Sequence, residues 1–279
     1  MDRKDFIKNS LGFLGASLIV PKVLMSCNNS KVDQKSDCEV WDSETEGPFP
    51  TKQPSEYSRS DIKGDRTGVN AIIKIIVTDA DDNCKPLKDA IVDIWHCDKD
   101  GNYSQYGGMV MQPTDYKSYN FLRGRQLTSE KGEVQFSSIF PGWYISRATH
   151  IHVHIYDKTG KSLKVTQIAF PEGKDSAVVV VNAAKSYGYT KGMDGYTYNA
   201  DDNVFSDDVD GNQIAKVSGS LEKGFMIDAN IVISTKNIEE FKEPIGGPGG
   251  PGMPPPDGKM GLPPGGKPMG PPPTEQQQK

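Results

Sequence analysis

The chain has 279 residues, of which 35% are hydrophobic and 25% charged, and its formal net charge is −5. This length is enough for one large or two small globular domains. A mean hydropathy of −0.56, with no long apolar run beyond the N-terminus, excludes a multispan membrane protein. The acidic balance argues against a nucleic-acid partner, because nucleic-acid-binding domains normally present a net basic face.

The N-terminus has the pattern of an export signal. Three basic residues precede an apolar stretch from Leu11 to Met25, and the small Ser26 stands directly before Cys27. This arrangement resembles a bacterial lipoprotein signal. The resemblance implies that Cys27 receives a lipid and anchors the chain to the cell envelope, on the inner or the outer membrane. An uncleaved apolar helix is the alternative.

The middle of the chain is predicted to form a mostly β domain. Six segments are short, rich in β-branched and aromatic residues, and often alternate in polarity: 71–77, 90–96, 133–139, 150–156, 163–170 and 225–234. Turn sequences separate them, no segment keeps a helical period, and 177–184 fits either a helix or a strand. Strands at this spacing without intervening helices predict an antiparallel β-sandwich with long loops and little helix.

A tail rich in proline and glycine follows this domain. From Pro244 to Pro273, 22 of 30 residues are one or the other. The tail lacks the apolar residues of a core, so we expect a disordered spacer, with a ligand for a proline-binding partner as the alternative. The predicted organisation is therefore a signal peptide in 1–27, a tether in 28–37, the β domain in 38–240 and the tail in 241–279.

The four cysteines suggest one disulfide. If Cys27 carries a lipid, then Cys38, Cys84 and Cys97 remain in an oxidising compartment, where a disulfide and one free thiol are expected. Cys84 and Cys97 flank a single predicted strand, which favours their pairing, although spacing alone does not fix it. No pair has the CxxC spacing of a zinc ribbon or a redox motif.

Three of the four histidines lie together, at His150, His152 and His154. Alternate residues of a strand point to one face, so two or three imidazoles would project from the same side. Neutral imidazole is a common ligand of iron, zinc and copper, so the pattern predicts a metal site. A solvent-exposed histidine stripe on an edge strand is the alternative.

Tyrosines near the histidines favour ferric iron over zinc. Tyr144 lies six residues before His150, Arg147 lies between them, and Tyr103 lies further upstream. The ordinary pKa of tyrosine is about 10, so a phenolate ligand needs a strong Lewis acid at neutral pH. Taken singly, each tyrosine also fits a core or surface position.

In these residues the sequence resembles the intradiol ring-cleavage dioxygenases, the family of the catechol and protocatechuate 3,4-dioxygenases. The resemblance implies a β-sandwich around one non-haem Fe(III), held by Tyr103, Tyr144, His150 and His152. His154 is left for a structural or supporting role. The matching segments, in order, are TEGPFP (45–50), DAIVDIWHCDKDGNYS (89–104), FLRGRQLTSEKGEVQFSSIFPGWY (121–144), RATHIHVHIY (147–156) and TQIAF (166–170).

The resemblance also implies a reaction. A catechol-type aromatic diol and O₂ are the substrates, and the ring opens between the two hydroxyl-bearing carbons to a muconate-type dicarboxylate. Tyr144 would accept a substrate proton, Arg147 would orient and stabilise the anionic ring, and Gln167 would contact the substrate side of the site. No organic cofactor is needed.

Several questions stay open at this stage. The short connection from Tyr144 to His150 resembles a secreted, lipoprotein branch of the family, and it fixes neither the catechol nor whether the chain forms a homo-oligomer. One alternative function is a catalytically silent, membrane-tethered β-sandwich that serves as a binding module. Another is an HxHxH zinc protein.

The acidic strings 79–83, 98–102 and 207–212 lack the twelve-residue calcium-loop pattern, so they are predicted to be turns.

Overall fold

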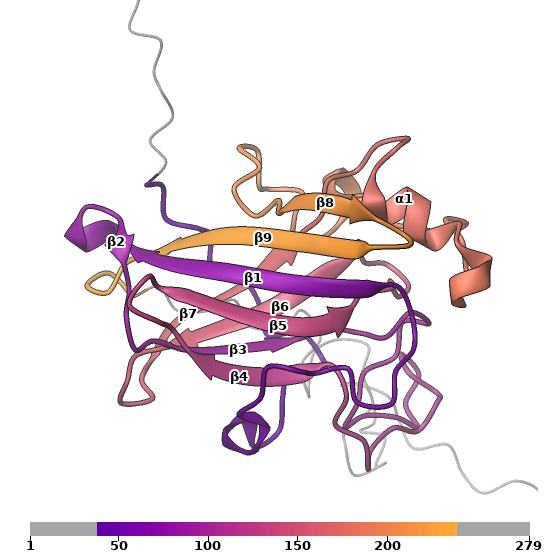
Figure 1. The fold of residues 1–279 in the computed structure, drawn as a ribbon, viewed down its shortest axis with the longest axis horizontal. Coiled ribbons are helices and arrows are strands. Elements are labelled where there is room, and N and C mark those ends of the chain that lie inside the picture. Colours follow the sequence, from indigo (N-terminus) through magenta and orange to yellow (C-terminus); the bar gives the residue numbers. More distant parts are fainter. Residues whose placement is uncertain (1–37, 239–279) are drawn as a thin grey trace, which may run out of the picture. The chain divides into compact units, whose positions relative to one another are not determined.

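A computed structural model describes residues 38–238, which form a mostly β unit (Figure 1). The predicted signal peptide with Cys27, the tether and the tail from residue 241 lie outside the described residues. Within 38–238, no helix is both long and apolar enough to cross a membrane. In chain order the elements are η1 (Pro54–Tyr57), β1 (Asn70–Asp79), η2 (Ala80–Asp82), β2 (Lys85–Pro86), β3 (Ile91–Trp95), β4 (Arg123–Leu127), β5 (Glu133–Ile139), β6 (His150–Tyr156), β7 (Ser162–Ala169), α1 (Ala177–Asn182), η3 (Lys185–Tyr187), η4 (Asn199–Asp201), β8 (Lys216–Ser220) and β9 (Gly224–Ile233).

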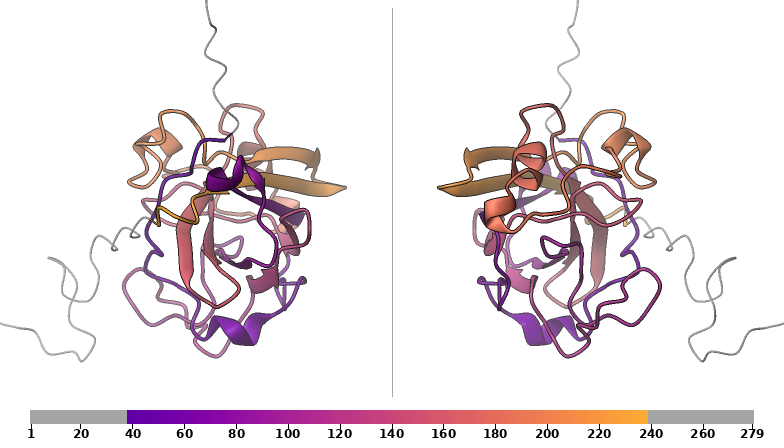
Figure 2. Two further views of the ribbon diagram at one scale, coloured as in Figure 1. Left: turned by 90° about the vertical axis from the view of Figure 1, so that its left-hand side faces the viewer. Right: turned by 90° about the vertical axis from the view of Figure 1, so that its right-hand side faces the viewer.

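The strands form two sheets, so the predicted sandwich is confirmed. One sheet has the order β2-β1-β9-β8 with β5 also paired to β1, and the other has the order β4-β3-β6-β7. Figure 2 shows the same unit from its two sides, each view turned by 90° from that of Figure 1. One pair departs from the antiparallel prediction, because β1 and β9 run parallel. Parallel partners need a long connection, and nearly the whole domain lies between these two strands.

The core lies between the sheets and is built by alternation along the strands. In β1, Ala71, Ile73, Ile75 and Val77 are buried at every second position. They share one apolar cluster with Ile151 and other residues of β6. The histidines of β6 occupy the intervening positions, so they project from the opposite face of their sheet. That outer face carries the candidate site.

The six predicted strands correspond to β1, β3, β5, β6, β7 and β9. The segment 177–184, open between helix and strand, contains α1, whose first turn is capped when the Ser176 hydroxyl accepts from the Val179 amide. The sequence patterns do not predict the two-residue β2, nor β4 and β8. The sequences of β4 and β8, RGRQL and KVSGS, are mostly polar, because β8 is largely exposed and the buried Arg123 of β4 is held by hydrogen bonds.

The disulfide joins Cys38 to Cys84, so the predicted Cys84–Cys97 pair is wrong. The Cα atoms of Cys38 and Cys84 are 5.6 Å apart, within the range of disulfides. Cys97 is a buried free thiol in the apolar cluster of Trp95 and Tyr103. An extended strand separates its ends by its whole length, so β3 carries Cys97 away from Cys84.

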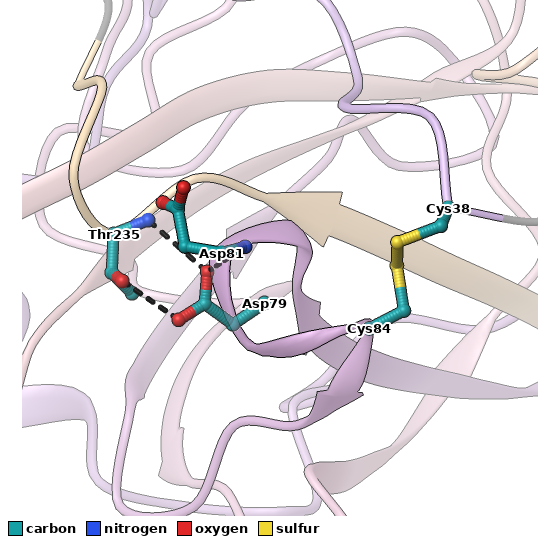
Figure 3. The surroundings of a disulfide bond; sticks show 5 residues. All are labelled: Cys38, Asp79, Asp81, Cys84 and Thr235. Carbon is teal, nitrogen blue, oxygen red and sulfur yellow. Dashed lines mark hydrogen bonds between the residues drawn. A yellow bond between two sulfur atoms is a disulfide. The ribbon is translucent and has the colours of Figure 1, made fainter.

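The turn before Cys84 also binds the segment that follows β9 (Figure 3). Asp79 accepts hydrogen bonds from the Thr235 hydroxyl at 2.7 Å and from its amide at 3.3 Å. Asp81 accepts from the hydroxyl of Ser234 at 2.6 Å. The predicted acidic turn at 79–83 is confirmed; its carboxylates bind the segment after β9, and the neighbouring Cys84 binds the start of the described chain through Cys38.

His96 links the two sheets through both ring nitrogens. Its Nδ1 donates to the carbonyl of Cys97 at 2.8 Å, which leaves Nε2 to accept from the Ser138 hydroxyl of β5 at 2.7 Å. The ring is buried, and burial lowers the pKa of His96 from 6.5 to about 4. The neutral imidazole is therefore the form that the folded protein holds.

We expect His96 to make the protein less stable in acid. The unfolded chain binds a proton near pH 6.5 and the folded chain only near pH 4, so stability falls as the pH drops through this window. The loss assigned to His96 amounts to about 3 kcal/mol. Urea unfolding of metal-free protein between pH 8 and pH 4 measures it, with His96→Gln as the comparison. Equal slopes for wild type and variant below pH 6.5 would contradict this assignment.

Candidate active site

A segment without regular structure covers the outer face of the β4-β3-β6-β7 sheet. The amide of Glu44 donates to the carbonyl of Val165 at 2.8 Å, and Gln167 Nε2 donates to the carbonyl of Thr45 at 2.8 Å. Further along, the ring of Phe49 stacks on Tyr103 with the centroids 4.7 Å apart. Residues 44–50 therefore close the space above β6 and β7 and bury the side chains beneath.

Tyr103, His150 and His152 converge under this cover. The hydroxyl oxygen of Tyr103 lies 3.1 Å from His150 Nε2 and 3.3 Å from His152 Nε2, and the two nitrogens are 3.1 Å apart. Tyr103 comes from the connection between β3 and β4, and the histidines come from the start of β6. All three side chains are buried. The structure thus brings together three of the four residues predicted to hold a metal.

These three atoms suit a metal centre. An imidazole nitrogen binds a first-row metal at about 2.0–2.1 Å, so neighbouring donor atoms of such a centre lie about 3 Å apart. His150 Nδ1 donates to the carbonyl of Ala148 at 2.6 Å, which leaves the Nε2 lone pair free for a metal. His152 Nδ1 is buried and has no hydrogen-bond partner among residues 38–238, and its ring stacks on Trp95. The residues present therefore fit a metal ion with nitrogen and phenolate ligands.

Burial keeps this cluster uncharged when no metal is bound. Burial, and then the charge of Arg147, hold the pKa of His150 well below 6.5, and burial likewise lowers that of His152. Burial, followed by the neighbouring Tyr144, raises the pKa of Tyr103 well above 10. A phenolate at this place needs a compensating cation.

Tyr144 lies at the edge of the cluster. Its ring is edge-on to Tyr103 and to His150, with centroid separations of 5.7 Å and 5.5 Å. Its hydroxyl oxygen is 3.5 Å from Nη1 of Arg147, at the long limit of a hydrogen bond. Burial raises the pKa of Tyr144, while Arg147 acts in the opposite direction. The described contacts of this hydroxyl are with Arg147 rather than with the imidazoles.

Arg147 and Gln167 form a hydrogen-bonded pair beside the cluster. Nη2 of Arg147 donates to Oε1 of Gln167 at 2.7 Å, and both side chains are buried. Gln167 is also the direct strand partner of His152 in the pairing of β6 with β7. The two residues predicted to face the substrate therefore lie next to each other and next to the predicted ligands.

His154 makes its contacts elsewhere. Its Nδ1 lies 2.9 Å from a carboxylate oxygen of Glu46, and its Nε2 lies 2.8 Å from the hydroxyl of Ser162. These bonds tie the cover segment to β6 and β7. A zinc site of three imidazoles would need His154 beside the other two, and in residues 38–238 no group of three or more His, Cys, Asp and Glu side chains is placed to hold a metal.

The sequence reading missed two buried charged residues that support the site. Arg123 donates to the carbonyls of Phe49 and Ser104 and to the hydroxyl of Thr51, so it joins the cover segment to the loop of Tyr103. Asp202 binds Arg147 and comes from the long connection between β7 and β8. Neither shows a pattern along the sequence, since arginine in a strand and aspartate in a turn are both ordinary.

Gly47 lies against the imidazole of His152. Its φ is +69°, and a Cβ added there would be 3.0 Å from Cε1 of His152. We expect Gly47→Ala to lower the free energy of unfolding by about 1–2 kcal/mol through its left-handed backbone. We also expect it to weaken metal binding about 10-fold, because the ring of His152 must move.

The matched control for this substitution is Gly192→Ala. Gly192 has a φ of +70°, and a Cβ there would meet nothing within 4 Å. Both variants carry the same backbone cost, so a difference in iron bound per chain isolates the contact with His152. Equal metal affinities in the two variants would show that Gly47 is needed only for its backbone conformation.

Comparisons with known proteins identify the family of the chain. A family model described as Dioxygenase matches residues 46–191. Chlorocatechol 1,2-dioxygenase of Rhodococcus opacus is 29% identical over an alignment of 143 residues, and the match covers 44% of this chain and 51% of the relative. The protocatechuate 3,4-dioxygenase beta chain of Burkholderia cepacia is 32% identical over an alignment of 108 residues, and the match covers 35% of this chain and 45% of the relative. The chain spans about half the length of the curated relatives it matches.

A solved structure supports the same family over a larger part of the chain. The intradiol ring-cleavage dioxygenase from Tetranychus urticae has a TM-score of 0.61 and 28% identity. The match covers 73% of this chain and 98% of that chain. The chain therefore belongs to the family of intradiol ring-cleavage dioxygenases, as its motifs predicted.

Proposed function

We propose that the protein is a non-haem Fe(III)-dependent intradiol dioxygenase that acts on a catechol-type aromatic diol. The observation that carries this proposal is the convergence of the Tyr103 hydroxyl with Nε2 of His150 and of His152 within 3.1–3.3 Å. Tyr103, Tyr144, His150 and His152 would hold the iron. When bound, Fe(III) would activate the diol toward O₂, so that the ring opens between the two hydroxyl-bearing carbons to a muconate-type dicarboxylate.

The residues around the iron ligands have distinct tasks in this reaction. A catechol hydroxyl must lose its proton before its oxygen can bind as an anion, and the phenolate oxygen of Tyr144 would accept one such proton. Arg147 orients the resulting anion through a guanidinium that stays charged at all working pH values. Gln167 holds this guanidinium through its Oε1 atom. The cover formed by residues 44–50 keeps water away from the aromatic ring that reacts.

The proposal is tested by visible absorption of the purified, iron-loaded protein, before and after anaerobic addition of catechol. Ferric tyrosinate should give a red-brown band, and catechol should move it to longer wavelength. Admission of O₂ should then consume one O₂ per catechol and yield a muconate-type product. A coloured protein that binds catechol without taking up O₂ would instead support the catalytically silent binding module. A colourless iron-loaded protein would overturn the tyrosine ligation.

We further propose that the chain is exported and anchored through a lipid on Cys27. The signal-like N-terminus supports this localisation, and so does a Cys38–Cys84 disulfide, since such bonds persist mainly in oxidising compartments. In cell fractionation, the wild type should enter the detergent phase and a Cys27→Ser variant should not. Equal partition of both into the soluble fraction would contradict the anchor.

A further inference from the structure

Asp202 is a wholly buried carboxylate next to the proposed active site. It follows η4, in the long connection between β7 and β8, and its exposed fraction is 0%. A charged carboxylate in such a place is unfavourable unless hydrogen bonds and a counter-charge replace its water. Asp202 has both kinds of partner: its counter-charge is Arg147, and the amides of Ala148 and Val204 donate hydrogen bonds to it.

The carboxylate binds the side chain of Arg147 and the backbone beside it. Nε of Arg147 donates to the two oxygens of Asp202 at 2.9 Å and 3.1 Å. The amide of Ala148 donates to Oδ2 at 2.7 Å, and the amide of Val204 donates to Oδ1 at 2.8 Å. Asp202 therefore fixes the guanidinium at its inner end and leaves Nη1 and Nη2 to face Tyr144 and Gln167.

The same contacts reach a proposed iron ligand. Ala148 donates its amide to Asp202 and accepts at its carbonyl the Nδ1–H of His150, at 2.6 Å. Ala148 thus binds Asp202 through the peptide unit before its Cα atom and the ring of His150 through the peptide unit after it. Phe205, from the same turn as Asp202, lies under the guanidinium of Arg147 with its ring centroid 5.6 Å away.

We propose that Asp202 is a positioning residue for the ring-cleavage reaction, acting through Arg147. It holds the guanidinium in the one orientation in which Nη1 and Nη2 face Tyr144 and Gln167, where an anionic diol would lie. The inference rests on the proposed function. It predicts that loss of the carboxylate charge impairs turnover of catechol more than it impairs iron binding or folding.

The test compares Asp202→Asn, Asp202→Glu and the neighbouring Asp201→Asn in the full-length, iron-loaded protein. Asp201 is exposed, so Asp201→Asn is the matched control. We expect Asp202→Asn to lower kcat/KM for catechol about 30- to 100-fold, since a displaced orienting group costs about 100-fold. Iron content and the visible band without catechol should fall less than kcat/KM, because Asp202 binds Arg147 directly but reaches His150 only through the backbone of Ala148.

Asp202→Glu keeps the charge and should recover most of the activity, to within about 10-fold of wild type. Asp201→Asn should stay within about 2-fold. The decisive measurement is a double-mutant cycle with Arg147→Gln. If Asp202 acts through Arg147, then Asp202→Asn costs little further activity once Arg147 is replaced.

Three results would overturn the inference. One is additive losses in the cycle. The second is equal losses in Asp202→Asn and Asp202→Glu together with lost iron, which would mark a merely structural role. The third is an Asp202→Asn variant as active as wild type. Failure of the proposed function looks different, because the wild type itself would then take up no O₂ with catechol. If Asp202→Asn does not fold, the test uses the activity of Asp202→Glu and the double-mutant cycle of Asp202→Glu with Arg147→Gln.

Discussion

Replacing Tyr103 by phenylalanine is expected to lower catechol-dependent oxygen uptake about 1,000-fold, or about 4 kcal/mol in transition-state free energy. The change removes the one oxygen that lies within 3.3 Å of both imidazole Nε2 atoms. Changes next to a metal ligand already cost 10- to 100-fold, so loss of a ligand should cost more. The visible band of the iron-loaded protein should weaken in parallel, since one of its two tyrosinates is gone.

Tyr106→Phe is the matched control, because Tyr106 lies in the same loop and also packs against Phe49. Its hydroxyl donates to the carbonyl of Pro50 at 2.8 Å and, within residues 38–238, forms no hydrogen bond with a histidine. We expect this variant to lose about 1 kcal/mol of stability and to keep its colour. Similar activities for the Tyr103 and Tyr106 variants would remove Tyr103 from the ligand set.

Removal of the Cys38–Cys84 disulfide is expected to lower the free energy of unfolding by about 4 kcal/mol. The bond closes a loop with a sequence separation of 46, and the chain-entropy relation gives this value for a loop of that length. In a domain of about 200 residues, such a loss lowers Tm by roughly 8–16 °C. Thermal unfolding of Cys38→Ser/Cys84→Ser, with and without dithiothreitol, measures the effect.

Cys97→Ala provides the comparison, since Cys97 is buried and forms no disulfide. This variant should remain as sensitive to dithiothreitol as the wild type, while the double serine variant should no longer respond. If the reductant leaves the Tm of the wild type unchanged, the disulfide does not form in the folded protein or does not stabilise it.

Sequence patterns predict the strands of this fold where the side chains alternate clearly. The alternation of β1 and β6 follows directly from one face packing in the core, and both strands appear where the sequence predicts them. β4 has no such signal, because Arg123 is buried there for its hydrogen bonds and not for its apolar surface. The pairing of Cys84 with Cys38 could not be predicted from the sequence either. It depends on how a segment without regular structure crosses a sheet.

The candidate site could be predicted as far as local spacing reaches. His150 and His152 are two residues apart on one strand, so their common face follows from β geometry alone. Tyr103 joined the set through the family resemblance, and the structure places its hydroxyl against both rings. The role of Asp202 could not be predicted, because an aspartate in an Asp-rich turn has the pattern of an ordinary turn residue. Its burial against Arg147 is evident only in the structure.

The cover over the outer sheet face has a consequence for the order in which the protein assembles. The contacts of the cover and of the site beneath it join residues far apart in sequence. Thr45 and Gln167 are separated by 122 positions, and Tyr103 and His150 by 47. Contacts of such separation form late, because long loops must close first. In zinc fingers the metal drives folding, whereas here the donor atoms meet only after β6 has paired with both β3 and β7. We therefore expect iron to be loaded into a chain that is already folded, and truncated chains ending before β7 to bind none.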